Sequence, residues 1–256
     1  MANKATEIIG PSLKVVEFLR RCGVERHINI IPNTVDLSDF MPENVSRDDV
    51  AAIRTKLGIR DGDTAMCFVG RLGKEKSIDV LVEFFAAHFR GDDAYKLFII
   101  GDGPEKENLE RQIVRLGVGA QVRLLGRIEH QFLPPYYHAC DLFTTASLSE
   151  MNSISMLEAM ASGLPVICSE IRGNTDLMGD SWTLSADRKR KLCPGGVMLS
   201  QLQDADVWAE ALEDMLSRKN CWKEMGEACI QRSQEFSLDT VEKKMREIYG
   251  RFAEME

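Results

Sequence analysis

Residues 66–101, MCFVGRLGKEKSIDVLVEFFAAHFRGDDAYKLFIIG, decide the fold class of this chain. Short apolar runs at Met66–Gly70 and Leu97–Gly101 suit buried strands of a parallel sheet, and Ser77–Phe89 between them has helical spacing. A strand, a helix and a second strand in this order form a βαβ unit, in which the helix covers one face of the sheet. The segment therefore predicts an α/β protein.

The same alternation of apolar runs and helical spacing extends over most of the chain. Further strands are expected at Ile28–Ile31, Val122–Gly126, Leu142–Ala146, Val166–Ser169 and Val197–Leu199. Further helices are expected at Ser12–Cys22, Arg47–Leu57, Glu105–Leu116, Phe132–Cys140, Ser153–Ser162 and Asp206–Arg218. Repeated βα units predict an open parallel sheet with helices on both faces, which binds ligands beyond the carboxyl ends of its strands.

The strand pattern is lost after Leu199. Helices are expected near 206–218, 220–235 and 238–254, so residues 201–256 would form a helical segment behind a sheet domain at 41–200. The basic run Arg188–Lys191 lies shortly before Pro194–Gly196 and is interpreted as a solvated loop.

The composition limits the classes of function. With 256 residues, 44% of them hydrophobic, and a net charge of −8, the chain is expected to be a folded acidic protein that does not bind nucleic acid. No stretch approaches the roughly 18 apolar residues of a membrane helix, and the first residues lack the apolar segment of a signal peptide, so we expect a cytoplasmic protein. Seven cysteines without C-x-x-C spacing and four scattered histidines indicate reduced thiols and no metal site.

A basic loop follows the strand at Met66–Gly70. It contains Arg71, Lys74 and Lys76 and leads directly into the next helix. The amino terminus of a helix favours phosphate, and a guanidinium together with an ammonium could hold a diphosphate without a metal ion. From the spacing alone, ordinary surface lysines are the alternative.

The turn at Gly101–Pro104 has only part of a dinucleotide-binding motif. The third glycine of G-x-G-x-x-G is missing, and Pro104 starts a helix. A simple turn is therefore favoured, and a nicotinamide-dependent dehydrogenase is disfavoured.

Two carboxylates bracket the start of the helix at Ser153–Ser162. Glu150 ends the loop after a strand, where it could simply interact with the helix dipole. Glu158 has apolar neighbours in the sequence and is expected to be buried, so it needs a partner. That partner is either a pair of ligand hydroxyls, such as a ribose diol, or a structural ion pair.

Taken together and in order, these blocks resemble the retaining glycosyltransferases of family 4, the glycosyl transferases group 1, which have the GT-B fold of two facing Rossmann-like domains. The blocks that carry the resemblance are Ile31–Asp36 with Phe40, Val69–Leu72 with Lys76, Leu97–Pro104, the E-x7-E pair of Glu150 and Glu158, and Glu158–Val166. Ile171–Asp176 is more similar to members that assemble capsular polysaccharides or exopolysaccharides. The resemblance implies one Rossmann-like half of a GT-B fold followed by a helical tail.

The resemblance also implies a role for each matching residue. The donor's pyrophosphate would be bound by the loop of Gly70, Arg71 and Lys76 and by the main chain of Ser153, Ile154 and Ser155. The base would lie near the main chain of Arg127 and Ile128, the ribose on Glu158, and the hexose near Glu150. The expected catalytic residues are Glu150, Arg71 and Lys76.

The same resemblance implies a donor but leaves the sugar open. The donor would be a nucleoside-diphosphate sugar, UDP before GDP or ADP, with no metal and no further cofactor. Many members place a glycine and an aromatic residue after the first glutamate, whereas Met151 and Asn152 stand here. The hexose preference is therefore not implied.

The start of the chain resembles the end of the family's acceptor-binding domain, at Ala5–Ser12, and residues 1–40 would link that domain to the first strand of the sheet domain. We therefore expect the donor-binding half of a hexosyltransferase for a glycan or lipid-linked acceptor, inactive by itself. The acceptor half would be a separate chain, or the carboxy-terminal helices would mediate self-association, with at most peripheral contact to the inner face of the membrane. The alternatives are a non-catalytic nucleotide-sugar-binding scaffold and, with less support because a second set of acid/base groups is lacking, a nucleotide-sugar epimerase.

Overall fold

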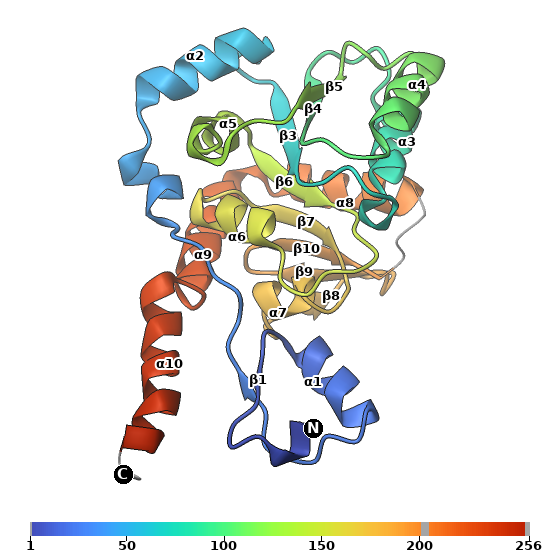
Figure 1. The fold of residues 1–256 in the computed structure, drawn as a ribbon. Helices are drawn as coiled ribbons and strands as arrows, with labels where there is room; N and C mark the ends of the chain where they lie inside the picture. Colours follow the sequence, from blue (N-terminus) through green and yellow to red (C-terminus); the bar gives the residue numbers. More distant parts are fainter. Residues whose placement is uncertain (1, 201–204, 254–256) are drawn as a thin grey trace.

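A computed structural model describes residues 2–200 and 205–253 and contains one large sheet between layers of helices (Figure 1). The sheet has eight strands in the order β5-β4-β3-β6-β7-β10-β9-β8. Their bounds are Thr64–Val69 (β3), Tyr95–Ile100 (β4), Val122–Gly126 (β5), Leu142–Thr145 (β6), Val166–Ser169 (β7), Thr183–Leu184 (β8), Arg190–Cys193 (β9) and Gly196–Leu199 (β10). The strands from β5 to β10 pair in parallel, which confirms the expected open parallel sheet.

The order of the strands reverses beside β3. This strand pairs with β4 on one side and with β6 on the other, where Met66 lies opposite Leu142. The chain thus runs outward from β3 to β5 and then returns to β6 on the opposite side. Such a switch point opens a crevice at the carboxyl ends of the strands. The loops after β3 and β6, which carry Lys76 and Glu150, flank this crevice.

Helices cover both faces of the sheet, as expected. On one face lie α3 (Ile78–His88), α4 (Lys106–Leu116) and α8 (Ala205–Ser217), whose apolar side chains join the sheet in one core cluster. On the other lie α2 (Arg47–Leu57), α5 (Pro134–Ala139), α6 (Ile154–Ala161) and α9 (Trp222–Gln234), which share a second cluster. Because α8 packs against α3 and β10, the cover of the sheet extends beyond Leu199.

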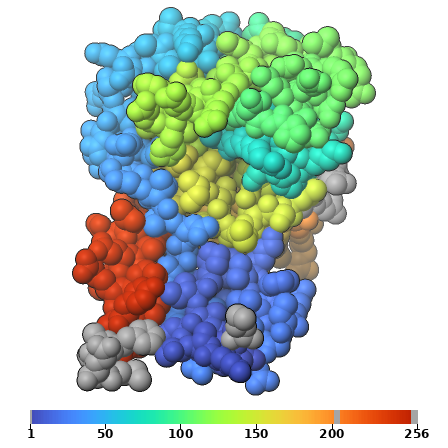
Figure 2. Space-filling view, viewed as in Figure 1, coloured from blue at the N-terminus to red at the C-terminus, as the bar shows by residue number. Residues whose placement is uncertain are grey.

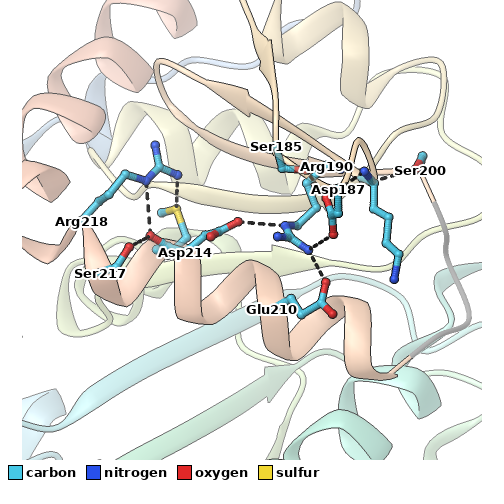
Figure 3. A network of polar contacts seen from close by, with 10 residues as sticks. Ser185, Asp187, Arg190, Ser200, Glu210, Asp214, Ser217 and Arg218 are labelled. Carbon is cyan, nitrogen blue, oxygen red and sulfur yellow. Dashed lines mark hydrogen bonds and ion pairs between the residues drawn. The ribbon is translucent and has the colours of Figure 1, made fainter.

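Two antiparallel strands, β8 and β9, extend the sheet beyond β10. The interpretation of Arg188–Lys191 as a solvated loop is wrong for Arg190 and Lys191, which belong to β9. Arg190 is buried, and its guanidinium contacts three carboxylates: Asp214 at 2.8 Å, Asp187 at 3.1 Å and Glu210 (Figure 3). The basic run looks solvated in the sequence because two of the three acids that neutralise Arg190, Glu210 and Asp214, lie on a later helix.

The first residues form a small separate unit. Strands β1 (Ile9–Gly10) and β2 (Asn29–Ile30) pair in parallel around α1 (Leu13–Arg21). The strand expected at Ile28–Ile31 therefore exists, but it lies outside the large sheet. Helix α10 (Leu238–Ala253) runs beside this unit in Figure 2, and Arg251 Nη1 lies 3.6 Å from Glu7 Oε1.

The remaining elements are short or terminal. The bounds are Asn174–Met178 for α7, and the 3₁₀ helices are Ala2–Lys4, Ser38–Phe40, Pro42–Asn44, Lys74–Lys76, His130–Phe132 and Lys219–Cys221. The helices expected near 220–235 and 238–254 are α9 and α10, although position 254 lies outside the described residues. Within the ranges that the structure describes, no helix is long and apolar enough to cross a membrane.

Candidate functional site

Two glycine-containing turns meet at the carboxyl ends of β3 and β4. Gly101 has φ +146°, and a Cβ atom there would lie 1.8 Å from the carbonyl oxygen of Gly70. The Leu72 amide donates to Asp102 O at 3.0 Å, and the Glu105 amide donates to Leu72 O at 2.9 Å. The Gly101 turn therefore needs glycine for close packing against the basic loop. It serves as a rigid support that fixes the start of the loop holding Arg71 and Lys76.

Lys76 and Glu150 come together at the switch point. Lys76 Nζ lies 2.5 Å from Glu150 Oε1, and Ser147 Oγ donates to the same oxygen at 2.8 Å. The two charged side chains are 19% and 10% exposed, so the pair lies at the surface of the crevice with one side open to solvent. Lys76 is thus not an independent surface lysine, because its ammonium is paired with Glu150, whereas Lys74 is exposed.

The main chain at Glu150 is held from two further sides. Lys14 Nζ of α1 donates to Ser149 Oγ at 2.7 Å and to Glu150 O at 3.2 Å. On the other side, a Cβ atom at Gly173 would come within 2.9 Å of Glu150, so only glycine permits this approach. Glu150 therefore projects from a loop whose backbone has little freedom.

Arg71 lies at the outer end of the basic loop. Its side chain is 66% exposed, and Nη2 is 3.4 Å from Glu75 Oε1. The pKa of Glu75 is lowered, mainly by a hydrogen bond from its own backbone amide and further by the nearby Arg71 charge. An exposed pair of this kind is weak and easily exchanged. Arg71 is therefore free to turn towards an anionic ligand.

Glu158 lies on α6 with both carboxylate oxygens occupied. Tyr137 OH of α5 donates to Oε2 at 2.8 Å, and His130 Nε2 lies 2.8 Å from Oε1. The Glu158 side chain is only 4% exposed, and burial raises its pKa although both hydrogen bonds oppose the shift. Burial, and then the charge of Glu158, raise the pKa of Tyr137 well above its usual value, so the phenol stays protonated as a donor.

The partners of Glu158 were missed by sequence reasoning. Tyr137 follows an apolar, proline-containing start of α5, and His130 follows β5 by four residues. Neither has a fixed spacing from Glu158. The only signal was positional, since His130 follows a strand at the edge of the sheet where ligands bind.

The amino terminus of α6 lies between the two glutamates in the sequence. The Leu157 amide makes the hydrogen bond to Ser153 O at 3.0 Å, so the amides of Ile154 and Ser155 precede the first helical hydrogen bond. Ser153 is the N-cap residue but makes no capping bond with its side chain; its hydroxyl lies 3.5 Å from that of Ser155. The helix start thus presents amide groups that suit an anion.

The residues expected near the base follow β5 directly. Arg127 is exposed, and Ile128 is half-buried against the core beneath α2, α5 and α6. Of the two residues that replace the family's glycine and aromatic, Met151 is exposed, whereas Asn152 Nδ2 donates to Asn33 O at 2.6 Å. In the described residues, no three His, Cys, Asp or Glu side chains cluster in a way that could hold a metal ion.

A cavity of about 720 Å³ lies beside this site, between the first residues of the chain and α7. Its lining includes Ser12, Asn152, Arg172, Thr175 and Asp176. Met151 and Asn152, which follow Glu150, are among its lining residues, and Glu150 and Glu158 are not.

The sequence matches known proteins over most of its length. Residues 49–235 match the family model of the glycosyl transferases group 1. The alpha-monoglucosyldiacylglycerol synthase of Acholeplasma laidlawii is 32% identical over 159 residues, covering 62% of this chain and 40% of that protein. The D-inositol 3-phosphate glycosyltransferase of Nocardia farcinica is 29% identical over 239 residues, covering 89% of this chain and 48% of that protein. The chain thus spans less than half the length of these relatives.

Solved structures show the same fold. HepE of Anabaena, solved in complex with UDP, superposes with a TM-score of 0.82 at 20% identity, covering 97% of this chain and 65% of that one. Sucrose-phosphate synthase of Thermosynechococcus elongatus superposes with a TM-score of 0.79 at 23% identity, covering 100% of this chain and 60% of that one. These likenesses confirm the expected half of a GT-B fold with its helical carboxy-terminal segment. Because the family model matches most of the chain, this protein belongs to the glycosyl transferases group 1.

Proposed function

We propose that this chain binds a nucleoside-diphosphate sugar, a UDP-sugar by preference, and forms the donor half of a retaining hexosyltransferase. The observation that carries the proposal is the Lys76–Glu150 pair at the switch point, with the free amides of α6 following Glu150 in the chain. A cation, a carboxylate and a helix amino terminus at one edge suit a ligand that joins a pyrophosphate to a sugar.

The chemistry follows from where charge develops. When the bond from the anomeric carbon to the β-phosphate breaks, negative charge grows on the departing diphosphate, and positive charge grows on the sugar. Lys76, Arg71 and the amides of Ile154 and Ser155 would stabilise the diphosphate without a metal ion. Glu150, held by Lys76 and Ser147, would face the sugar near its anomeric centre.

The nucleoside would bind along α6 and the end of β5. Glu158 would accept hydrogen bonds from the ribose hydroxyls, and the main chain of Arg127 and Ile128 would face the base. A preference for uridine is supported by HepE, which was solved with UDP and with UDP-glucose.

Two observations bear on the acceptor. The name of the Acholeplasma relative, a synthase of a glucosylated diacylglycerol, favours a lipid acceptor, whereas Ile171–Asp176 favours a growing polysaccharide. The cavity lined by Asn152 and Arg172 lies beside Glu150 and has room for part of such an acceptor. Because the chain spans less than half the length of these relatives, we propose that transfer requires a further acceptor-binding part. The proposed location of the transfer is the cytoplasm, at the inner face of the membrane.

Calorimetric titration with UDP, GDP, ADP and NAD, in EDTA and again with magnesium, tests the proposal. We expect selective binding of one nucleoside diphosphate, UDP first, with equal affinity in both buffers. Binding only with magnesium, or preference for NAD, would contradict it. Transfer of sugar to a simple acceptor by the purified chain alone would contradict the requirement for an acceptor-binding part.

A non-catalytic scaffold is a second candidate, favoured by the surface of α10. Leu238 and Tyr249 on this helix are exposed large side chains, as association surfaces often have. Sedimentation analysis distinguishes the two: concentration-dependent self-association that UDP does not change would favour the scaffold.

A further inference from the structure

The two partners of Glu158 differ in how firmly they are fixed. Tyr137 is buried among the aromatic and aliphatic side chains beneath α5 and α6, so its hydrogen bond to Oε2 belongs to the core. The His130 side chain is 55% exposed and comes from a short 3₁₀ helix, yet it contacts a carboxylate that is only 4% exposed. His130 therefore lies between Oε1 and solvent.

The surroundings of His130 hold it in place without enclosing it. Its ring meets the ring of Phe40 edge-on, with 5.2 Å between the centroids, and Phe40 in turn packs against Tyr137 at 5.7 Å. Of the polar contacts that the structure gives to the described residues, only the one with Glu158 involves the His130 side chain. Rotation of this side chain into solvent would cost one hydrogen bond and part of one ring contact.

A ligand that binds Glu158 must replace one of the two partners of its carboxylate. The buried Tyr137 holds Oε2, whereas Oε1 is held by the exposed His130, so Oε1 is the oxygen that a ligand from solvent can reach. We propose that His130 is a displaceable cap on Glu158: it satisfies the buried carboxylate when no nucleotide is bound, and it gives up Oε1 to the ribose hydroxyls of the donor. This inference rests on the proposed function, in which Glu158 binds ribose.

The cap explains how a buried carboxylate that binds a ligand can be stable in the absence of that ligand. An unpaired buried charge is costly, so a carboxylate kept for a ligand needs a temporary partner. It also makes His130 a residue that opposes donor binding, in contrast to Lys76 and Arg71. The exchange depends on the ribose diol, because its hydroxyls replace the imidazole N–H as donors to Oε1.

The test compares two ligands on two variants. His130→Ala removes the cap, and His130→Gln keeps a side chain that can donate to Oε1. We expect His130→Ala to bind UDP about two to ten times more tightly than the unmodified chain, the range of one net hydrogen bond, and His130→Gln to remain near the unmodified chain. The affinity for 2′,3′-dideoxyuridine diphosphate, which lacks the diol, is expected to be the same in all three proteins.

Glu158→Gln separates the inference from the proposed function. If Glu158→Gln binds UDP as well as the unmodified chain, the ribose role of Glu158 fails, and the cap fails with it. If Glu158→Gln weakens UDP binding but His130→Ala gives no gain, the cap alone is wrong. Weaker binding of both ligands by His130→Ala would overturn it too, since that result would make His130 a structural or direct ligand contact. Thermal melting of each variant verifies that it is folded.

Discussion

In the proposed function, phosphate binding depends most on Lys76. In the proposed complex its ammonium faces the diphosphate, and a hydrogen bond to a charged group contributes roughly 1.5–3 kcal/mol. Lys76→Ala should therefore weaken the binding of UDP by about 10- to 100-fold and leave the binding of uridine unchanged. Lys74→Ala, in the same 3₁₀ helix but exposed, is the matched control and should bind both ligands normally. Equal weakening of UDP and uridine by Lys76→Ala would show that Lys76 supports the fold instead.

Glu158 couples the site to stability through its raised pKa. Burial favours the protonated carboxyl in the folded chain, so its contribution is complete below the pKa of the unfolded chain and is lost as pH rises through the raised folded pKa. Glu158→Gln cannot lose a proton. The free energy of unfolding of the variant minus that of the unmodified chain should therefore be larger at pH 8 than at pH 4, so that the variant is relatively more stable at pH 8; urea titration at both pH values measures it. A difference that is the same at both would contradict the raised pKa.

The sequence could place these residues but not their distances. Lys76 and Glu150 were both assigned to the carboxyl edge, yet they are separated by 74 positions, and only the pairing of β3 with β6 brings them within 2.5 Å. For Glu158 the sequence left a ligand and an ion pair open. The structure adds partners, Tyr137 and His130, that no spacing in the sequence indicates.

At the scale of elements, the contact between the turns after β3 and β4 requires glycine. A methyl group at Gly101 would overlap the carbonyl of Gly70, and no side-chain movement can relieve this clash because the carbonyl belongs to the backbone. Gly101→Ala should lower the free energy of unfolding by about 3 kcal/mol or more. Gly250→Ala on α10, where nothing lies within 4 Å of the new methyl group, is the control and should change stability by at most about 1 kcal/mol, upward. Similar urea midpoints for the two variants would show that the turns move apart easily.

The edge of the sheet depends on Arg190. Removing its guanidinium leaves Asp187, Asp214 and Glu210 facing one another around β9 and α8. Arg190→Met should cost about 2–3 kcal/mol of unfolding free energy, below the full effect of a buried pair because the three acids are partly exposed. Arg188→Ala, two residues before it, changes an exposed side chain and should stay within about 0.5 kcal/mol. If Arg190→Met left the free energy of unfolding unchanged, β8 and β9 would be held by backbone pairing alone.

Elements with strong periodicity were predictable, and elements stabilised by distant partners were not. The helix at Arg47–Leu57 and the strands at Val122–Gly126 and Val166–Ser169 have the bounds that their patterns predict. Strand β9 was not predicted, because charged residues such as Arg190 and Lys191 are typical of loops. In the structure Arg190 is paired with acids of α8 and Lys191 with Glu170.

At the scale of the whole molecule, the sequence predicted the parallel sheet because each βα unit is local, but the place of the first residues was not predictable. The pairing of β1 with β2 is local, but the approach of α10 to this unit depends on a contact between the two ends of the chain, Arg251 with Glu7. Lys14, Asn33 and Glu17 then connect this unit to Glu150, Asn152 and Arg172. The loop that carries Glu150 is therefore positioned partly from outside the large sheet.

The most direct test of the account is a crystal structure of this chain with UDP, grown in EDTA. We expect the diphosphate to lie between Lys76 and the amino terminus of α6. The ribose hydroxyls should contact Glu158 Oε1 with His130 turned away, and the base should lie at Arg127 and Ile128. A nucleotide bound elsewhere, for example in the cavity lined by Thr175 and Asp176, or bound with its phosphates far from Lys76, would contradict the central claim that the switch point beside β3 is the donor site.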